Sequence, residues 1–157
     1  MSKSTIKPTI YLRYIDDVFG IWEHSPQQLE EFSQLANTIH PNIALTLRSN
    51  QSTIDFLDVE VSLNSDNTMS TKLYEKDTNA HMYVHKDSNH PKATKDNIAY
   101  GLALRSRRIC SNDIDYERSK RQIESNLILR GHTKNTIKEK ISKADGKNRE
   151  ELLTSSS

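Results

Sequence analysis

Polar and apolar positions alternate along much of the first half of the chain, as they do in β-strands. Two short apolar runs, at residues 10–12 and 18–22, are separated by a polar segment at residues 13–17. β-Favouring runs with so short a separation predict a tight hairpin. Asp16 and Asp17 are expected at or near its turn.

A helix is expected directly after this hairpin. Ser25 can cap its amino terminus, Pro26 suits the first helical position, and Gln28 can complete a capping box. The helix should end before Pro41. Its apolar face consists of five residues at helical spacing: Leu29, Phe32, Leu35, Ala36 and Ile39.

The next segments predict a small sheet. Alternating apolar residues indicate half-buried strands at residues 43–47 and 57–63. Residues 64–67, Asn-Ser-Asp-Asn, have the chemistry of a turn, and residues 69–73 are expected to return as a second hairpin arm.

Beyond residue 78 the apolar spacing becomes helical. Residues 79–91 are expected to form an irregular linker, and residues 154–157 a disordered tail. Four helices are predicted between them: over residues 92–110, from a cap at Asn112 or Asp113 to Gly131, after a cap at Thr133, and over residues 149–153. The expected fold class is therefore α+β, with a helical region after the sheet.

The composition is polar for one compact domain, with 34% hydrophobic and 27% charged residues. No apolar stretch approaches the roughly 20 residues that span a bilayer, and the amino terminus has no apolar signal-like segment. Cys110 is the single cysteine, which excludes an internal disulfide. We expect an intracellular protein, nuclear or cytoplasmic, with no membrane partner.

The charges are unevenly distributed. Residues 1–85 hold six Lys and Arg against eleven Asp and Glu, a net charge of −5, whereas residues 86–149 hold sixteen against eight, a net charge of +8. This asymmetry favours a metal-binding or catalytic surface next to a polyanion-binding surface. It is also compatible with helical surfaces that are simply rich in Lys and Arg.

The best candidate for chemistry is the motif Tyr14-Ile-Asp-Asp17. Two adjacent carboxylates repel each other without a cation, and Mg²⁺ prefers carboxylate, water and phosphate oxygens. Nucleotidyl transfer uses two such cations, at the attacking hydroxyl and at the leaving pyrophosphate. The alternative is an ordinary acidic turn between two strands.

Residues 13–22, Arg-Tyr-Ile-Asp-Asp-Val-Phe-x-Ile-Trp, resemble a catalytic motif of the reverse transcriptases of Penelope-like retroelements. Further motifs follow in the order found in that family: His40-Pro-Asn-Ile43, Ile54-Asp-Phe-Leu-Asp58, Leu73-Tyr-Glu-Lys76, Tyr83-Val-His85, Ser88-Asn-His-Pro91, Ala103-Leu-Arg-Ser-Arg-Arg-Ile-Cys-Ser111 and Leu129-Arg-Gly131. The resemblance covers roughly residues 10–153.

This resemblance implies the carboxyl-terminal part of a polymerase palm at residues 1–78 and a helical thumb at residues 92–153. The thumb region is also similar to a helix-turn-helix domain of animal proteins, a name that does not by itself establish promoter reading. Asp16 is implied as a catalytic metal ligand and Asp17 as its supporting partner, with Mg²⁺ or Mn²⁺ as the cofactor of the complete enzyme.

The resemblance also implies primer-binding residues. Tyr14 would pack near the primer terminus, and Phe56 and Leu57 fall where the family places the hairpin that grips the primer. In this polymerase type another metal-binding aspartate lies on an earlier palm strand, yet none of the 15 residues before Asp16 is acidic. We therefore expect a fragment that lacks the upstream polymerase half, holds no metal tightly and is inactive alone.

Other candidate sites rest on the residues themselves. Arg105, Arg107 and Arg108 crowd one predicted helix beside Tyr100, and arginine binds phosphate well, so they are candidate nucleic-acid phosphate ligands. The alternative is internal pairing with nearby acids at residues 113–117. Several further groups favour structural interpretations: Asp55, Asp58 and Glu60 as paired or solvated charges, His81, His85 and His90 as polar loop residues, and Cys110 as a small buried residue.

Three functions remain open. The first is a non-autonomous piece of an RNA-directed DNA polymerase, and the second is a nucleic-acid-binding helix-turn-helix-like module without catalysis. The third is a non-catalytic interaction protein. For the first two the expected partner is an RNA–DNA or DNA duplex, held through phosphates.

Overall fold

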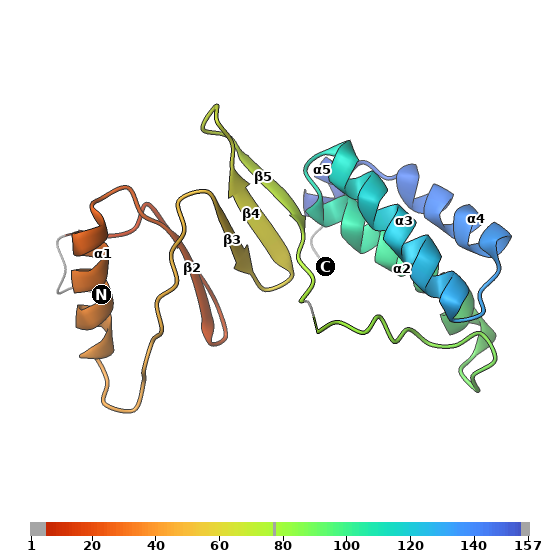
Figure 1. The fold of residues 1–157 in the computed structure, drawn as a ribbon, viewed down its shortest axis with the longest axis horizontal. Helices are drawn as coiled ribbons and strands as arrows, with labels where there is room; N and C mark the ends of the chain where they lie inside the picture. The colour runs from red at the N-terminus through yellow and green to blue at the C-terminus, as the bar shows by residue number, and fades with distance from the viewer. Residues whose placement is uncertain (1–5, 77, 155–157) are drawn as a thin grey trace. The chain divides into compact units, whose positions relative to one another are not determined.

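The fold is described by a computed structural model that covers residues 6–76 and 78–154 (Figure 1). It is of the α+β class, as the sequence predicts. The chain forms two compact units, one that ends at Leu57 and one that begins at Asp58. No helix of the described residues is both long and apolar enough to cross a membrane.

The predicted hairpin forms at the start of the first unit. Strands β1 (Ile10–Tyr14) and β2 (Asp17–Ile21) pair in antiparallel register, with Ile10 opposite Ile21 and Tyr14 opposite Asp17. Ile15 adopts a positive φ of 52° in the two-residue turn. Asp16 therefore lies in the turn, and Asp17 is the first residue of the returning strand.

The predicted helix follows as α1 (Pro26–Asn37). Its capping box is formed: the Gln28 backbone N–H donates to Ser25 Oγ over 3.3 Å, and the Ser25 N–H donates to Gln28 Oε1 over 3.1 Å. The rings of Trp22 and Phe32 lie 5.3 Å apart and pack the helix against the chain that leaves the hairpin.

The strand predicted at residues 43–47 is wrong. The segment is irregular, and its alternating apolar residues are exposed. The Asn37 side chain hydrogen-bonds both backbone groups of Leu45: Asn37 Nδ2 donates to the Leu45 carbonyl over 3.0 Å, and Asn37 Oδ1 accepts from the Leu45 N–H over 2.6 Å. These are the groups through which Leu45 would pair with a neighbouring strand.

The strand predicted at residues 57–63 needs a smaller correction. The chain forms β3 (Thr53–Phe56) and then β4 (Val59–Leu63), with Leu57 at a positive φ of 56° in the turn between them. The prediction followed the alternation of apolar residues and missed this local turn. Strand β5 (Met69–Leu73) then pairs with β4 as the predicted hairpin, in antiparallel register.

The predicted helices form in the second unit as α2 (Lys92–Ile109), α3 (Asp113–Leu129), α4 (Lys134–Asp145) and α5 (Arg149–Thr154). Asn112 caps α3 through a 2.9 Å bond from the Asp115 N–H. Figure 1 shows α2, α3 and α4 packed side by side. Their shared core contains seven buried residues: Ala99, Ala103, Ile123, Leu127, Ile137, Ile141 and Ala144.

The segment before α2 is irregular, as predicted for residues 79–91, but it is fixed to the helices. The Arg130 Nε–H donates to the Tyr83 carbonyl over 2.8 Å, and the Lys86 N–H donates to the Arg130 carbonyl over 3.0 Å. Tyr83 also packs against the helical core. The segment therefore belongs to the folded helical unit rather than acting as a flexible spacer.

The β4–β5 hairpin is also bound to the helices. Thr71 Oγ1 donates to the Ile109 carbonyl over 2.6 Å, and the Ser111 N–H donates to the Thr71 carbonyl over 2.8 Å. By packing, the chain thus divides after Leu57 and not after residue 78. Of the predicted tail, Thr154 ends α5, and residues 155–157 lie outside the described residues.

Candidate nucleic-acid interface

Helices α3 and α4 are joined by a four-residue connection, residues 130–133. Gly131 has a φ of +82°, where a Cβ atom would lie 3.3 Å from the His85 ring. A short connection that contains glycine is typical of the helix-turn-helix motif. Ile137 and Ile141 are buried on the face of α4 that packs against the core, so the opposite face of the helix is exposed to solvent.

The outward side of α4 is polar and cationic. Lys134, Asn135, Lys138 and Ser142 are all exposed. Helical spacing places Asn135 and Ser142 away from the buried isoleucines, whereas Lys134 is exposed in the first turn of the helix, on the same side as Ile137 and Ile141. Lys134 Nζ lies 3.4 Å from a carboxylate oxygen of Glu124, whereas Lys138 has no polar partner within the described part of the chain. The helix holds four lysines and two acidic residues, a net charge of +2.

The three arginines of α2 have different surroundings. Arg105 binds Asp58, with 2.8 Å from Nε to Oδ2, and Arg107 Nη1 donates to Asp113 Oδ1 over 2.9 Å. Arg108 is exposed and has no hydrogen-bond or ion-pair partner among residues 6–76 and 78–154. Two of the three guanidinium groups thus already have carboxylate partners, and their phosphate binding stays a prediction.

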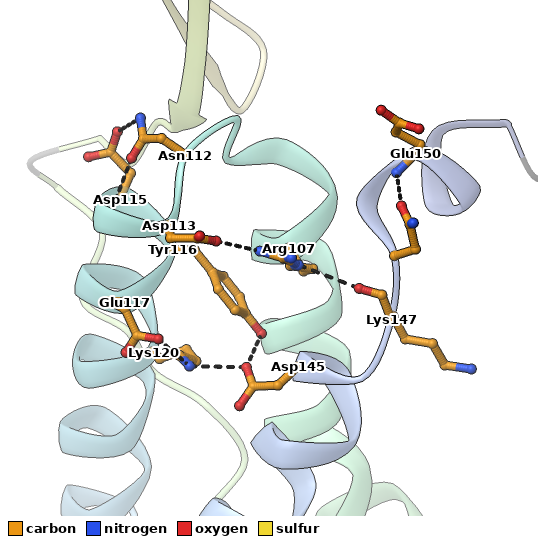
Figure 2. Close-up of polar contacts among 11 residues, drawn as sticks. Arg107, Asn112, Asp113, Asp115, Tyr116, Glu117, Lys120, Asp145, Lys147 and Glu150 are labelled. Atoms are coloured by element: carbon orange, nitrogen blue, oxygen red, sulfur yellow. Dashed lines mark hydrogen bonds and ion pairs between the residues drawn. The ribbon is translucent and has the colours of Figure 1, made fainter.

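Arg107 belongs to a polar network around Tyr116, a residue only 3% exposed (Figure 2). Its guanidinium lies 5.1 Å from the centre of the Tyr116 ring, and Lys120 Nζ lies 4.8 Å from the same centre. The Tyr116 hydroxyl donates to Asp145 Oδ1 over 2.9 Å, and Lys120 Nζ donates to the same oxygen over 3.0 Å. The network joins α2, α3 and the end of α4, so its cations stabilise the helical unit.

The pKa values in this network follow from its packing. Burial, and then the hydrogen bond to Asp145, raise the pKa of Tyr116 well above its ordinary value. Burial lowers the pKa of Lys120, but hydrogen bonds and charge interactions with Glu117 and Asp145 raise it more, so the net shift is upward. Both groups are therefore held in the forms, neutral tyrosine and charged lysine, that make these bonds.

The carboxylate pair lies in the other unit. Asp16 and Asp17 are both exposed at the β1–β2 turn, and Arg13 Nε donates to the Ile15 carbonyl over 2.8 Å within that turn. Among the described residues no group of three or more His, Cys, Asp or Glu side chains could hold a metal ion. A Mg²⁺ ion at this pair would take its remaining oxygen ligands from water or substrate phosphate, and a catalytic role of the pair stays a prediction.

The predicted primer-binding residues differ in exposure. Tyr14 and Leu57 are exposed, whereas Phe56 is half-buried with its ring 5.6 Å from that of Phe19. Their roles at a primer stay predictions. The three neighbouring acids are paired, as the structural interpretation expects: Asp55 with Arg48, Asp58 with Arg105 and Glu60 with Lys72.

His81 and His85 make contacts within the helical unit, and Cys110 is buried. His81 Nε2 lies 3.5 Å from Glu75 Oε2, and the His85 ring lies next to Gly131. Cys110 is 2% exposed at the end of α2, which confirms the prediction of a small buried residue.

Residues 82–142 match the family model of the animal helix-turn-helix domain. No curated protein and no solved structure matches the chain. The matched region begins in the irregular segment beside Tyr83, contains α2 and α3 and ends within α4.

The helix-turn-helix match supports a nucleic-acid-binding role for the helical unit. It also agrees with the packing of the segment before α2, which the sequence interpretation set apart as a linker. The Tyr116 network was missed as well, although the spacing of Tyr116 and Lys120 along one helix could have indicated that they meet.

Proposed function

We propose that α2, α3 and α4 form a helix-turn-helix-like module that binds nucleic-acid duplexes, mainly through phosphates. The observation that carries this proposal is the match of residues 82–142 over three helices whose last member has an exposed cationic face. In helix-turn-helix proteins the second helix of the motif lies in the major groove, with its first residues towards the bases. In this chain the corresponding residues are Lys134, Asn135 and Lys138.

Phosphate binding is the dominant expected contribution. A lysine side chain is a flexible point charge that attracts phosphate but reads bases poorly, and it supplies most of the exposed charge of α4. Asn135 is the one exposed side chain near the start of α4 with the paired donor and acceptor that adenine recognition uses. We therefore expect a strongly salt-dependent affinity and a small sequence preference.

The test is binding of the full chain to labelled DNA and RNA–DNA duplexes at several salt concentrations. Lys134→Gln combined with Lys138→Gln should flatten the plot of log affinity against log salt by about 1.8, because each phosphate contact contributes about 0.9. The matched control, Lys76→Gln with Lys92→Gln, removes the same charge from exposed positions outside α4. Equal effects of the two pairs, or salt-independent binding, would contradict the proposal.

A selected-sequence pool distinguishes two modes of binding. A module that reads bases would enrich one sequence by roughly a thousandfold over random duplex, and Asn135→Ala would abolish that preference. A module that holds whichever duplex is presented would show no such winner. We expect the second result.

A second candidate function is a fragment of an RNA-directed DNA polymerase, in which the helical unit is the thumb. The observation that favours it is the Asp16–Asp17 pair at the tip of a hairpin, together with the ordered motifs described above. This proposal is compatible with duplex binding by the helices, since a thumb also holds duplex product without reading its sequence.

A further inference from the structure

A groove of about 450 Å³ lies between α2 and α4, on a different side of α4 from Lys134 and Lys138. It is lined by five residues: Asn97, Tyr100, Lys140, Lys143 and Lys147. Lys143 follows Lys134 by nine positions, which is 900° of helix and places the two on opposite sides of α4. We call this feature the lysine groove.

The lysine groove has an excess of positive charge. Lys140 Nζ donates to Asn97 Oδ1 over 3.1 Å, and Lys143 Nζ donates to Glu139 Oε1 over 2.9 Å. The Lys147 ammonium has no partner in the described ranges, and Figure 2 shows its side chain directed away from Tyr116. The five lining residues include no acid, and Glu139, the partner of Lys143, offsets one of the three lysines, so these groups carry a net charge of about +2 and attract anions.

Tyr100 gives the groove an aromatic wall. The side chain is half-buried: it packs against the helical core and also lines the groove. Its hydroxyl has no hydrogen-bond partner in the part of the chain that the structure describes. A half-buried ring next to lysines can stack on a nucleobase while the lysines bind the adjoining phosphates.

We propose that the lysine groove binds single-stranded nucleic acid, with one base on Tyr100 and the flanking phosphates on Lys143 and Lys147. The groove is open to solvent, and its volume of about 450 Å³ is comparable with that of sites that hold small molecules. This inference rests on the proposed nucleic-acid binding but assigns a second surface, so that a duplex with a single-stranded extension could use both.

The experiment measures binding of the full chain to a labelled twelve-residue oligo(dT), to an abasic oligomer of the same length and to a blunt duplex. Tyr100→Leu keeps apolar bulk against the core but removes the stacking face, and should weaken oligo(dT) binding by about tenfold. Tyr100→Phe keeps the ring and should change it less than twofold. The abasic oligomer should bind wild type and Tyr100→Leu equally.

The charge of the groove is tested separately. Lys143→Gln with Lys147→Gln should flatten the salt dependence of oligo(dT) binding by about 1.4, because a single-strand phosphate contact contributes about 0.7. The same pair should leave blunt-duplex binding nearly unchanged. Lys134→Gln with Lys138→Gln should instead weaken blunt-duplex binding and leave oligo(dT) binding nearly unchanged.

The outcomes separate the two proposals. Oligo(dT) binding that ignores Tyr100→Leu, or that depends on Lys134 and Lys138 alone, would refute the lysine groove while duplex binding stands. Duplex binding that is unchanged by Lys134→Gln with Lys138→Gln, while the oligo(dT) variants behave as expected, would refute the α4 face alone. Absence of binding to every probe would overturn both.

Discussion

Replacement of Tyr116 by phenylalanine tests whether the buried polar network stabilises the helical unit. The variant removes only the hydroxyl that donates to Asp145 and leaves the ring between Arg107 and Lys120. A hydrogen bond to a charged acceptor contributes about 1.5–3 kcal/mol. The Asp145 side chain is 41% exposed and keeps Lys120 at 3.0 Å, so we expect a loss at the low end, about 1.5 kcal/mol.

The assay is urea unfolding followed by helical circular dichroism, which reports mainly on α2–α5. With a slope of about 2 kcal/mol per molar urea, the loss should lower the midpoint by about 0.7 M. The matched control is Tyr100→Phe, which removes a hydroxyl with no partner among the described residues and should shift the midpoint by less than about 0.25 M. Equal midpoints for the two variants would refute the stabilising role of the hydrogen bond.

A pH series gives the same test an independent readout. The folded state raises the pKa of Tyr116 above its ordinary value of 10.0, so folding favours the neutral phenol. That contribution is complete below pH 10 and declines as the pH rises further, since the unfolded chain then ionises first. Wild type should therefore lose more stability above pH 10 than Tyr116→Phe does, because the Lys120 titration is common to both.

Three further predictions use the same chain. Gly101→Ala should raise the free energy of unfolding by about 0.5–1 kcal/mol in urea titrations, because Gly101 lies within α2 and the added Cβ meets no atom within 4 Å. Gly131→Ala should lower the free energy of unfolding by more than about 1 kcal/mol, because Gly131 has a φ of +82° and the His85 ring is close. Leu127→Ala, at a fully buried position, should cost about 3 kcal/mol in the same titration. In a primer-extension assay with Mg²⁺ or Mn²⁺, the 157-residue chain should incorporate no more labelled nucleotide than its Asp16→Ala variant, because the described residues offer the aspartate pair no further metal ligand.

Helix boundaries could be predicted well from the sequence because their signals are local. The capping box at Ser25 and Gln28 needs only residues within one turn of α1, and both of its hydrogen bonds form. The cap at Asn112 and the stop at Gly131 are local in the same sense.

Sheet pairing was harder to predict because alternation does not identify a partner strand. The segment at residues 43–47 has the required pattern, yet the Asn37 side chain holds both backbone groups of Leu45. That contact joins residues eight positions apart, and no periodicity encodes it. The turn at Leu57 was missed for a similar reason, since leucine is not a residue that usually marks a positive φ.

The candidate site shows the limit of reading charge from the sequence. Arg105, Arg107 and Arg108 are adjacent in the chain, but two of them bind carboxylates that lie in other elements, Asp58 and Asp113. Asp58 lies 47 residues from Arg105, and Asp113 lies 6 residues from Arg107. Such partners determine whether a guanidinium is available to a ligand. Of these three arginines, only Arg108 has no partner in the described part of the chain.

The division of labour between arginine and lysine follows from their chemistry and bears on how the helical unit would bind nucleic acid. Arginine offers a planar set of donors that suits fixed internal acceptors, and Arg105, Arg107 and Arg130 are used in this way. Lysine is more strongly hydrated and pairs less rigidly, and Lys138 and Lys147 remain without side-chain partners in the described residues. Affinity carried by lysines is long-range, depends steeply on salt and discriminates weakly between bases. The protein should therefore distinguish nucleic acids by whether they are double- or single-stranded rather than by their base sequence.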